Sequence, residues 1–123
     1  DLKSHFDRSV DEIVAGLAGL SDIVAESEIW DGPVGARLGF IAPPALGLRA
    51  DDPAWEWAQN WRNGRAKSVA LTSKLEALCQ ARGHLFFDGN RGAVSSTRDP
   101  IHWDEATHVR MGAAVATWLA KVL

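Results

Sequence analysis

Apolar residues recur at steps of three and four positions near the start of the chain, which predicts an amphipathic helix. The apolar positions are Val10, Ile13, Val14, Leu17, Leu20 and Val24. Ser9 and Glu12 stand where this pattern begins, at the spacing of a capping box, in which each side chain accepts a hydrogen bond from the other residue's backbone N–H. We therefore expect the helix to begin directly after Ser9.

Two short apolar runs predict buried strands. The first covers residues 38–42 and is halted by Pro43 and Pro44, while the second covers residues 85–87. Apolar runs without polar alternation are typical of parallel strands that are covered on both faces. Both runs are too short for the buried helix that could otherwise explain them.

A long helix is predicted between the two strands. After the loop expected at residues 45–52, Asp52 and Pro53 supply a capping residue and the residue favoured at the first helical position. The helical pattern continues to Gly83, with a break expected near Asn63-Gly64. Three tryptophans fall in its first part, namely Trp55, Trp57 and Trp61.

The order helix, strand, helix, strand, helix predicts an α/β fold with a parallel sheet. Asp104 is the expected N-cap of the last helix. The inward face of that helix would hold Met111, Val115, Trp118, Leu119 and Val122. A sheet of two strands is too small to stand alone, and no strand pattern precedes the first helix. We therefore expect residues 1–123 to be part of a single longer domain.

Charge and composition exclude several classes of partner. The formal net charge is -3 and the basic residues are scattered, so we expect no nucleic-acid partner. No apolar run approaches the roughly 20 residues that span a bilayer, so we expect no membrane partner. The single cysteine, Cys79, falls on the apolar face of a predicted helix, which favours a buried and inert thiol. A cytoplasmic location is the default expectation.

The candidate chemistry lies where the last loop meets the last helix. Asp99 precedes His102 by three residues, so its carboxylate can fold back onto the imidazole. A histidine held in this way can take a proton from a hydroxyl nucleophile and return it to a leaving group. Taken alone, the spacing is more often that of a surface histidine beside a helix-capping aspartate. The histidine spacings fit no closed metal site, so we expect no bound metal.

The wider sequence resembles the SGNH (GDSL-type) hydrolases. The segment 99–118 is similar to the last sequence block of that family, with Asp-x-x-His, a hydrophobic residue, Asp and then a helix containing His and Gly. Residues 40–44 resemble the family's strand and proline pair, and residues 85–88 the strand before the catalytic loop. Asp1-Leu2-Lys3, followed by Phe6, resembles the end of the Gly-x-Asn-Asp block. These similarities follow the family's order along nearly the whole chain.

The resemblance implies a flavodoxin-like three-layer α/β/α SGNH hydrolase fold, of which this chain is the C-terminal half. It implies a Ser-His-Asp triad in which His102 and Asp99 come from this chain. The serine and the oxyanion-binding Gly and Asn would come from an N-terminal fragment. The subgroup that the chain resembles most is that of the aryl esterases and acyltransferases. We therefore expect hydrolysis or transfer of the acyl groups of small carboxylic esters, no cofactor and a homo-oligomer.

The same subgroup implies an acyl pocket walled by the region after the prolines, from Leu46 to Trp61. Ile101 and Trp103 adjoin His102 and are further candidates for this pocket, and Lys3 could reach the polar end of a substrate. Packing in a core or an interface is an equal alternative for the tryptophans, and a solvated or salt-bridged lysine is the commoner one for Lys3.

A second function remains open at this point. A flavodoxin-like α/β domain that binds or regulates, without catalysis, would share the architecture of the esterases and lack their chemistry.

Overall fold

The computed structural model describes residues 2–27, 37–96 and 98–123. Its helices and strands follow the predicted order. The sequence also indicates a Gly- and Pro-containing connection at residues 31–35, which lies outside the described residues. The elements are α1 (Val10–Ala25), β1 (Gly39–Ala42), α2 (Gly64–Arg82), β2 (Leu85–Asp88) and α3 (Glu105–Val122). Short 3₁₀-helices lie at Ser4–Phe6, Leu48–Asp51, Ala58–Trp61 and Gly89–Arg91.

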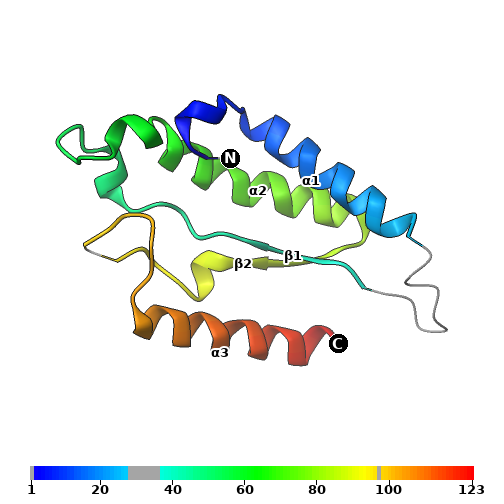
Figure 1. The fold of residues 1–123 in the computed structure, drawn as a ribbon. Helices are drawn as coiled ribbons and strands as arrows, with labels where there is room; N and C mark the ends of the chain where they lie inside the picture. The colour runs from blue at the N-terminus through cyan, green and yellow to red at the C-terminus, as the bar shows by residue number, and fades with distance from the viewer. Residues whose placement is uncertain (1, 28–36, 97) are drawn as a thin grey trace.

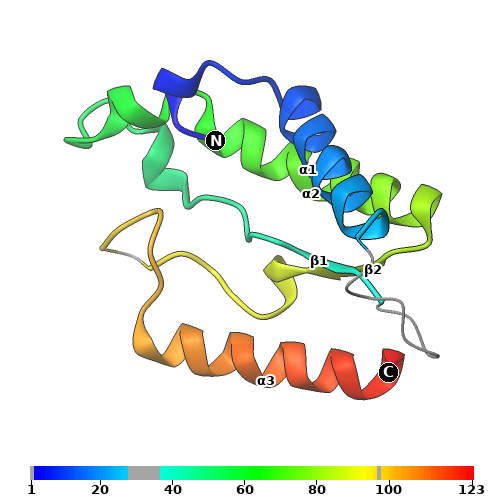
Figure 2. The ribbon, with the colours of Figure 1, turned by 45° about the vertical axis from the view of Figure 1, so that its right-hand side comes forward.

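The two strands form a parallel pair between two helical layers. β1 pairs with β2 in a register that places Phe40 opposite Phe86 and Ile41 opposite Phe87. Helices α1 and α2 cover one face of this pair and α3 covers the other, as both ribbon views show (Figures 1 and 2). The predicted α/β class and the three-layer arrangement are confirmed.

The first helix begins where the sequence predicts. The Ser9 hydroxyl accepts the N–H of Glu12 at 3.2 Å, and the Glu12 carboxylate accepts the N–H of Ser9 at 2.8 Å, which completes the capping box. Hydrogen bonds from the Ser9 backbone and hydroxyl, followed by one from Arg8, hold the pKa of Glu12 below its ordinary value. The sequence signal for this helix start is therefore correct in its atomic detail.

Two apolar cores lie on opposite faces of the strand pair. On the side of α1 and α2, Ala42 packs with Leu75 and Cys79, and Cys79 is fully buried. Burial raises the pKa of the Cys79 thiol and the negative charge of Glu76 raises it further, so the predicted burial of this thiol is confirmed. The core under α3 consists of Phe87, Ala93 and Met111, with Trp103, Ala114, Val115 and Trp118 packed against it.

The predicted helix is wrong over residues 53–63, which form turns and one 3₁₀-helix. Asp52 does not cap a helix, because its carboxylate accepts the N–H of Ala54 and closes a tight turn. Trp55 is buried with Leu46 and Ala50, so tertiary packing overrides the local helical pattern here. The break at Asn63 is confirmed: this residue lies in the left-handed region with φ 61°, and α2 begins at the next residue.

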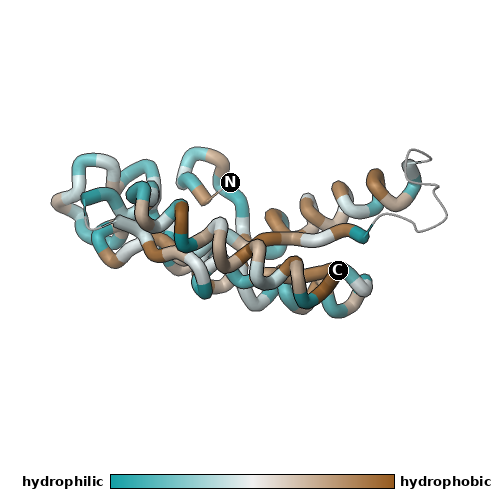
Figure 3. Tube along the Cα trace, turned by 90° about the horizontal axis from the view of Figure 1, so that it is seen from below, coloured by the Kyte–Doolittle hydropathy of each residue, from teal (hydrophilic) through white to brown (hydrophobic). Residues whose placement is uncertain are grey.

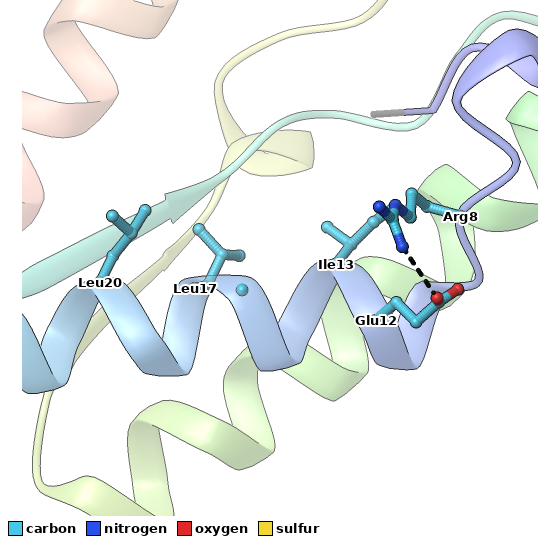
Figure 4. Close-up of a pocket in the computed structure, with 6 residues that line it drawn as sticks. Arg8, Glu12, Ile13, Leu17 and Leu20 are labelled. Carbon is cyan, nitrogen blue, oxygen red and sulfur yellow. Dashed lines mark hydrogen bonds and ion pairs between the residues drawn. The ribbon is translucent and has the colours of Figure 1, made fainter.

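The apolar face of α1 is only partly covered. Figure 3 shows hydrophobic positions recurring along this helix, and Figure 4 shows Ile13, Leu17 and Leu20 projecting from it beside the Arg8–Glu12 ion pair. Leu20 is 57% exposed, and Ile41 on β1 is 45% exposed. In the described part of the chain, β1 pairs with β2 alone, so its outer edge is open beside these apolar side chains.

We predict that the isolated 123-residue chain lacks a cooperative thermal transition and associates in solution. An open strand edge next to exposed apolar side chains promotes pairing with other chains, and two strands do not make a stable sheet. Circular dichroism melting and size-exclusion chromatography measure both properties. Ile41→Lys should reduce association more than Leu48→Lys, because only Ile41 lies on the open edge. A reversible cooperative transition in the unmodified chain would contradict this prediction.

Candidate active site

The loops that follow the two strands meet at one edge of the sheet. The segment after β1 contains the 3₁₀-helix Leu48–Asp51, and the loop after β2, residues 93–104, contains Asp99 and His102. In α/β sheets, the loops at the carboxyl ends of the strands build the active sites. The candidate catalytic residues therefore lie where this fold ordinarily places chemistry.

Asp99 and His102 are in direct contact. The Nδ1 atom of His102 lies 2.5 Å from Oδ2 of Asp99, which is the contact expected from their spacing. The His102 side chain is 80% exposed and that of Asp99 is 38% exposed. No hydrogen bond to Nε2 of His102 is present among the described residues. One ring nitrogen is thus held by a carboxylate, while the other remains open to a reacting group.

The environment of Asp99 keeps its carboxylate ionised. Burial alone would raise the pKa of Asp99, but hydrogen bonds from the His102 ring and from the N–H groups of Ile101 and His102 outweigh that effect. The two N–H groups lie 2.7 and 3.2 Å from Oδ1. The pKa of Asp99 consequently lies below its ordinary value of 3.8, and the group is a carboxylate at neutral pH.

The loop around Asp99 is fastened to the segment after β1. The N–H of Gly47 donates to the Pro100 carbonyl at 2.9 Å, and Arg49 donates to the Arg98 carbonyl at 2.9 Å. Pro100 is fully buried. A Cβ on Gly47 would lie 3.2 Å from the Cα of Pro100, so this close approach favours glycine. These two bonds hold the loop on either side of Asp99.

Three of the predicted pocket residues come together in one cluster, and a fourth lies beside it. Leu46 is buried with Ala50 and Trp55, and the half-buried side chains of Trp61 and Ile101 pack against them; we call this group the Leu46 cluster. The Nζ atom of Lys3 lies 5.6 Å from the centre of a Trp61 ring, within the range of a cation–π interaction. The structure therefore gathers Leu46, Trp61, Ile101 and Lys3, although they are far apart in the sequence.

Trp103 lies in a different environment. It packs against the core under α3 that contains Phe87 and Met111, and its ring lies 5.1 Å from that of His108. Trp103 therefore does not join Trp61 in the Leu46 cluster. The packing alternative has direct contacts to support it, and the pocket role of Trp103 stays a prediction.

Asp104 caps α3, as predicted, by accepting the N–H of Thr107 at 2.8 Å. Hydrogen bonds from the side chain and then the backbone of Thr107 hold the pKa of Asp104 below its ordinary value. Among residues 2–27, 37–96 and 98–123, no group of three His, Cys, Asp or Glu side chains could hold a metal. No helix of the described part is long and apolar enough to cross a membrane.

Two residues at this site, Ser96 and Gly47, were not predicted from the sequence. The Ser96 hydroxyl bonds the backbone of Asp99, and Gly47 contacts Pro100. A serine three residues before an aspartate is a known signal for a local side-chain-to-backbone bond, so Ser96 could have been found. Gly47 carries no comparable signal, because its role depends on a contact with a residue far along the chain.

Comparison with solved structures covers the whole chain. The M. smegmatis aryl esterase is 25% identical with a TM-score of 0.84, over 100% of this chain and 57% of that chain. A carbohydrate acetylesterase from Sinorhizobium meliloti is 26% identical with a TM-score of 0.83, over 100% of this chain and 57% of that chain. No family model and no curated protein matches the sequence.

The chain has the SGNH-type esterase fold. The resemblance inferred from its sequence blocks is thereby confirmed at the level of fold. The likeness is partial, since the chain spans little more than half the length of the two esterases. The part of the SGNH fold that is present includes the loop bearing Asp99 and His102. The similarity inferred around Asp1 lies partly outside the described residues.

We predict that His102→Ala raises the pKa of Asp99 toward 3.8 without restoring it fully. The substitution removes the ring hydrogen bond but keeps the backbone N–H groups. Because the folded pKa is depressed, the stability that Asp99 contributes is present above 3.8 and is lost as pH falls through the folded value. Carboxyl ¹³C NMR titration of the folded protein measures the pKa values of Asp99 and Asp104, and Asp104 is the internal control. An unchanged Asp99 pKa would contradict the assignment of cause.

Proposed function

We propose that this chain is the C-terminal part of a serine esterase domain that hydrolyses small carboxylic esters. The observation that carries the proposal is the contact between His102 Nδ1 and Asp99 Oδ2, which leaves an exposed imidazole with one open nitrogen. The likeness to an aryl esterase and a carbohydrate acetylesterase supports this class of reaction. No cofactor is required by this chemistry.

His102 would serve as the proton carrier. As general base, its Nε2 takes the proton of a serine hydroxyl while the oxygen attacks the ester carbonyl; as general acid, it returns the proton to the leaving alcohol. Asp99 holds the Nδ1–H tautomer and stabilises the imidazolium that forms. A second cycle with water releases the acid, and an alcohol in place of water would give acyl transfer.

The serine and the oxyanion-binding Gly and Asn would come from an N-terminal fragment outside this chain. The open edge of β1 is the place where further strands would pair. Beside it, a groove on α1 supplies apolar surface (Figure 4); it is lined by Arg8, Glu12, Ile13, Gly16, Leu17 and Leu20. Ile13 and Leu17 line both the groove and the pocket that reaches Ile41. The N-terminal fragment is therefore expected to complete both the sheet and the active site. Association of complete domains into a homo-oligomer is part of the same proposal.

The acyl group of the substrate would lie against the Leu46 cluster. This cluster reaches the site through Ile101, the residue before His102. Apolar side chains suit the acyl chain, while Lys3 beside Trp61 supplies a positive charge for a polar end. Trp103, the residue after His102, is proposed as a second contact.

The triad is tested in the complete protein with p-nitrophenyl acetate. His102→Ala should abolish catalysis, and Asp99→Asn should lower kcat by up to about 10⁴-fold, because the imidazole then takes the wrong tautomer. His84→Ala serves as a matched control, since His84 lies away from the site beside Phe40. Normal activity in folded His102→Ala would refute the triad assignment, whereas no activity in the unmodified complete protein would favour a non-catalytic binding domain.

The pocket is tested with a chain-length series of p-nitrophenyl esters. Trp61→Ala and Trp103→Ala should each change relative kcat/KM by roughly 10- to 200-fold, because each methylene in an apolar pocket contributes only a small selectivity. Trp103→Ala should also lower Tm, since Trp103 packs under α3. Trp57, which is 54% exposed, provides the control substitution Trp57→Ala. Unchanged selectivity for either variant would assign that tryptophan to packing alone.

A further inference from the structure

Ser96 makes three hydrogen bonds that close the loop segment bearing Asp99 and His102. Its hydroxyl accepts the N–H of Asp99 at 3.0 Å and donates to the carbonyl of the same residue at 3.1 Å. Its own N–H donates to the His102 carbonyl at 3.1 Å. One serine thus contacts the backbone of both candidate catalytic residues.

Other bonds hold the residues that flank Asp99 independently of Ser96. The bonds from Gly47 to Pro100 and from Arg49 to Arg98 fix the residues on either side of Asp99, but they do not touch Asp99 itself. Without the Ser96 hydroxyl, both polar groups of the Asp99 backbone would lose a bond, while the flanking residues would keep theirs. The consequence is local: the backbone of Asp99 could shift, and its carboxylate would move relative to the imidazole and to the N–H groups of Ile101 and His102, while the flanking residues stay in place.

We infer that Ser96 is a positioning residue, which acts through Asp99 to hold the His102 imidazole in the orientation for proton transfer. This inference rests on the proposed esterase function. Ser96 does not contact the reacting atoms. Its effect on the reaction is therefore expected to appear in kcat rather than in substrate binding, and to disappear when the Asp99 carboxylate is absent.

The test is a double-mutant cycle in the complete protein, with p-nitrophenyl acetate as substrate. Ser96→Ala should lower kcat by about 10- to 100-fold with little change in KM, the scale of loss expected from misplacing a catalytic group. Ser96→Thr, which keeps a hydroxyl, should restore most of the rate. In an Asp99→Asn background, Ser96→Ala should cause little further loss, because residues that act as one unit are not additive.

Ser95→Ala is the matched control, because Ser95 is the adjacent serine and its hydroxyl makes no hydrogen bond to the described residues. Wild-type kcat in Ser96→Ala, or an equal loss in the Asp99→Asn background, would overturn the inference. If Ser96→Ala unfolds, Ser96→Cys replaces it: sulfur is a weaker hydrogen-bond partner, so kcat should fall, and wild-type kcat would overturn the inference. The unmodified protein and His102→Ala in the same assay separate the two proposals. No activity in the unmodified protein refutes the esterase function, whereas wild-type kcat in Ser96→Ala beside an inactive His102→Ala refutes the role of Ser96 alone.

Discussion

Parallel pairing of β1 and β2 determines which parts of the chain can meet. Both strands run in the same direction, and Ala42, the last residue of β1, lies opposite Asp88, the last residue of β2. The segments that follow the two strands therefore leave from the same end of the sheet. The pair closes tightly there: a Cβ on Gly89 would lie 2.3 Å from the Ala42 carbonyl oxygen, so glycine permits the approach. The neighbourhood of the segment after β1 and the loop of Asp99 follows from this pairing.

Backbone hydrogen bonds then convert that neighbourhood into a defined site. The hydroxyl of Ser68, a fully buried residue of α2, accepts the N–H of Leu46 at 3.0 Å. Gly47, which follows Leu46 in the chain, donates its N–H to the Pro100 carbonyl. Buried backbone groups require partners, so the two segments cannot separate without leaving polar groups unsatisfied. The side chain of Leu46 faces its apolar cluster while its backbone is held by α2. The proposed pocket wall and the loop of Asp99 are therefore held in a fixed position relative to each other.

Local signals in the sequence predicted the features that depend on neighbours in the chain. Ser9 and Glu12, Asp104, and the contact of Asp99 with His102 all act over three residues, and each is present as expected. The segment with the tryptophans was not predictable in this way, because burial of Trp55 against residues before it replaces the helix that Asp52-Pro53 indicates. The proximity of Lys3, Leu46 and Ile101 could not be predicted in this way either, because these residues are far apart in the sequence and only the fold brings them together. The periodicity of apolar residues identifies the apolar face of a helix, but it does not tell which parts of that face are buried, as the exposed Leu20 shows.

In the proposed esterase, completion of the sheet and completion of the active site are one event. Parallel strands all run in the same direction. A strand that pairs in parallel with the open edge of β1 would therefore have its carboxyl end at the same end of the sheet as the loop that bears His102. The loop after such a strand would lie beside the loop that bears Asp99 and His102. The same strand would cover Ile41 and the apolar face of α1 at Leu17, and burial of that surface would stabilise the association. Stability and chemistry would then depend on the same interface, whereas the orientation of His102 depends on contacts within this chain.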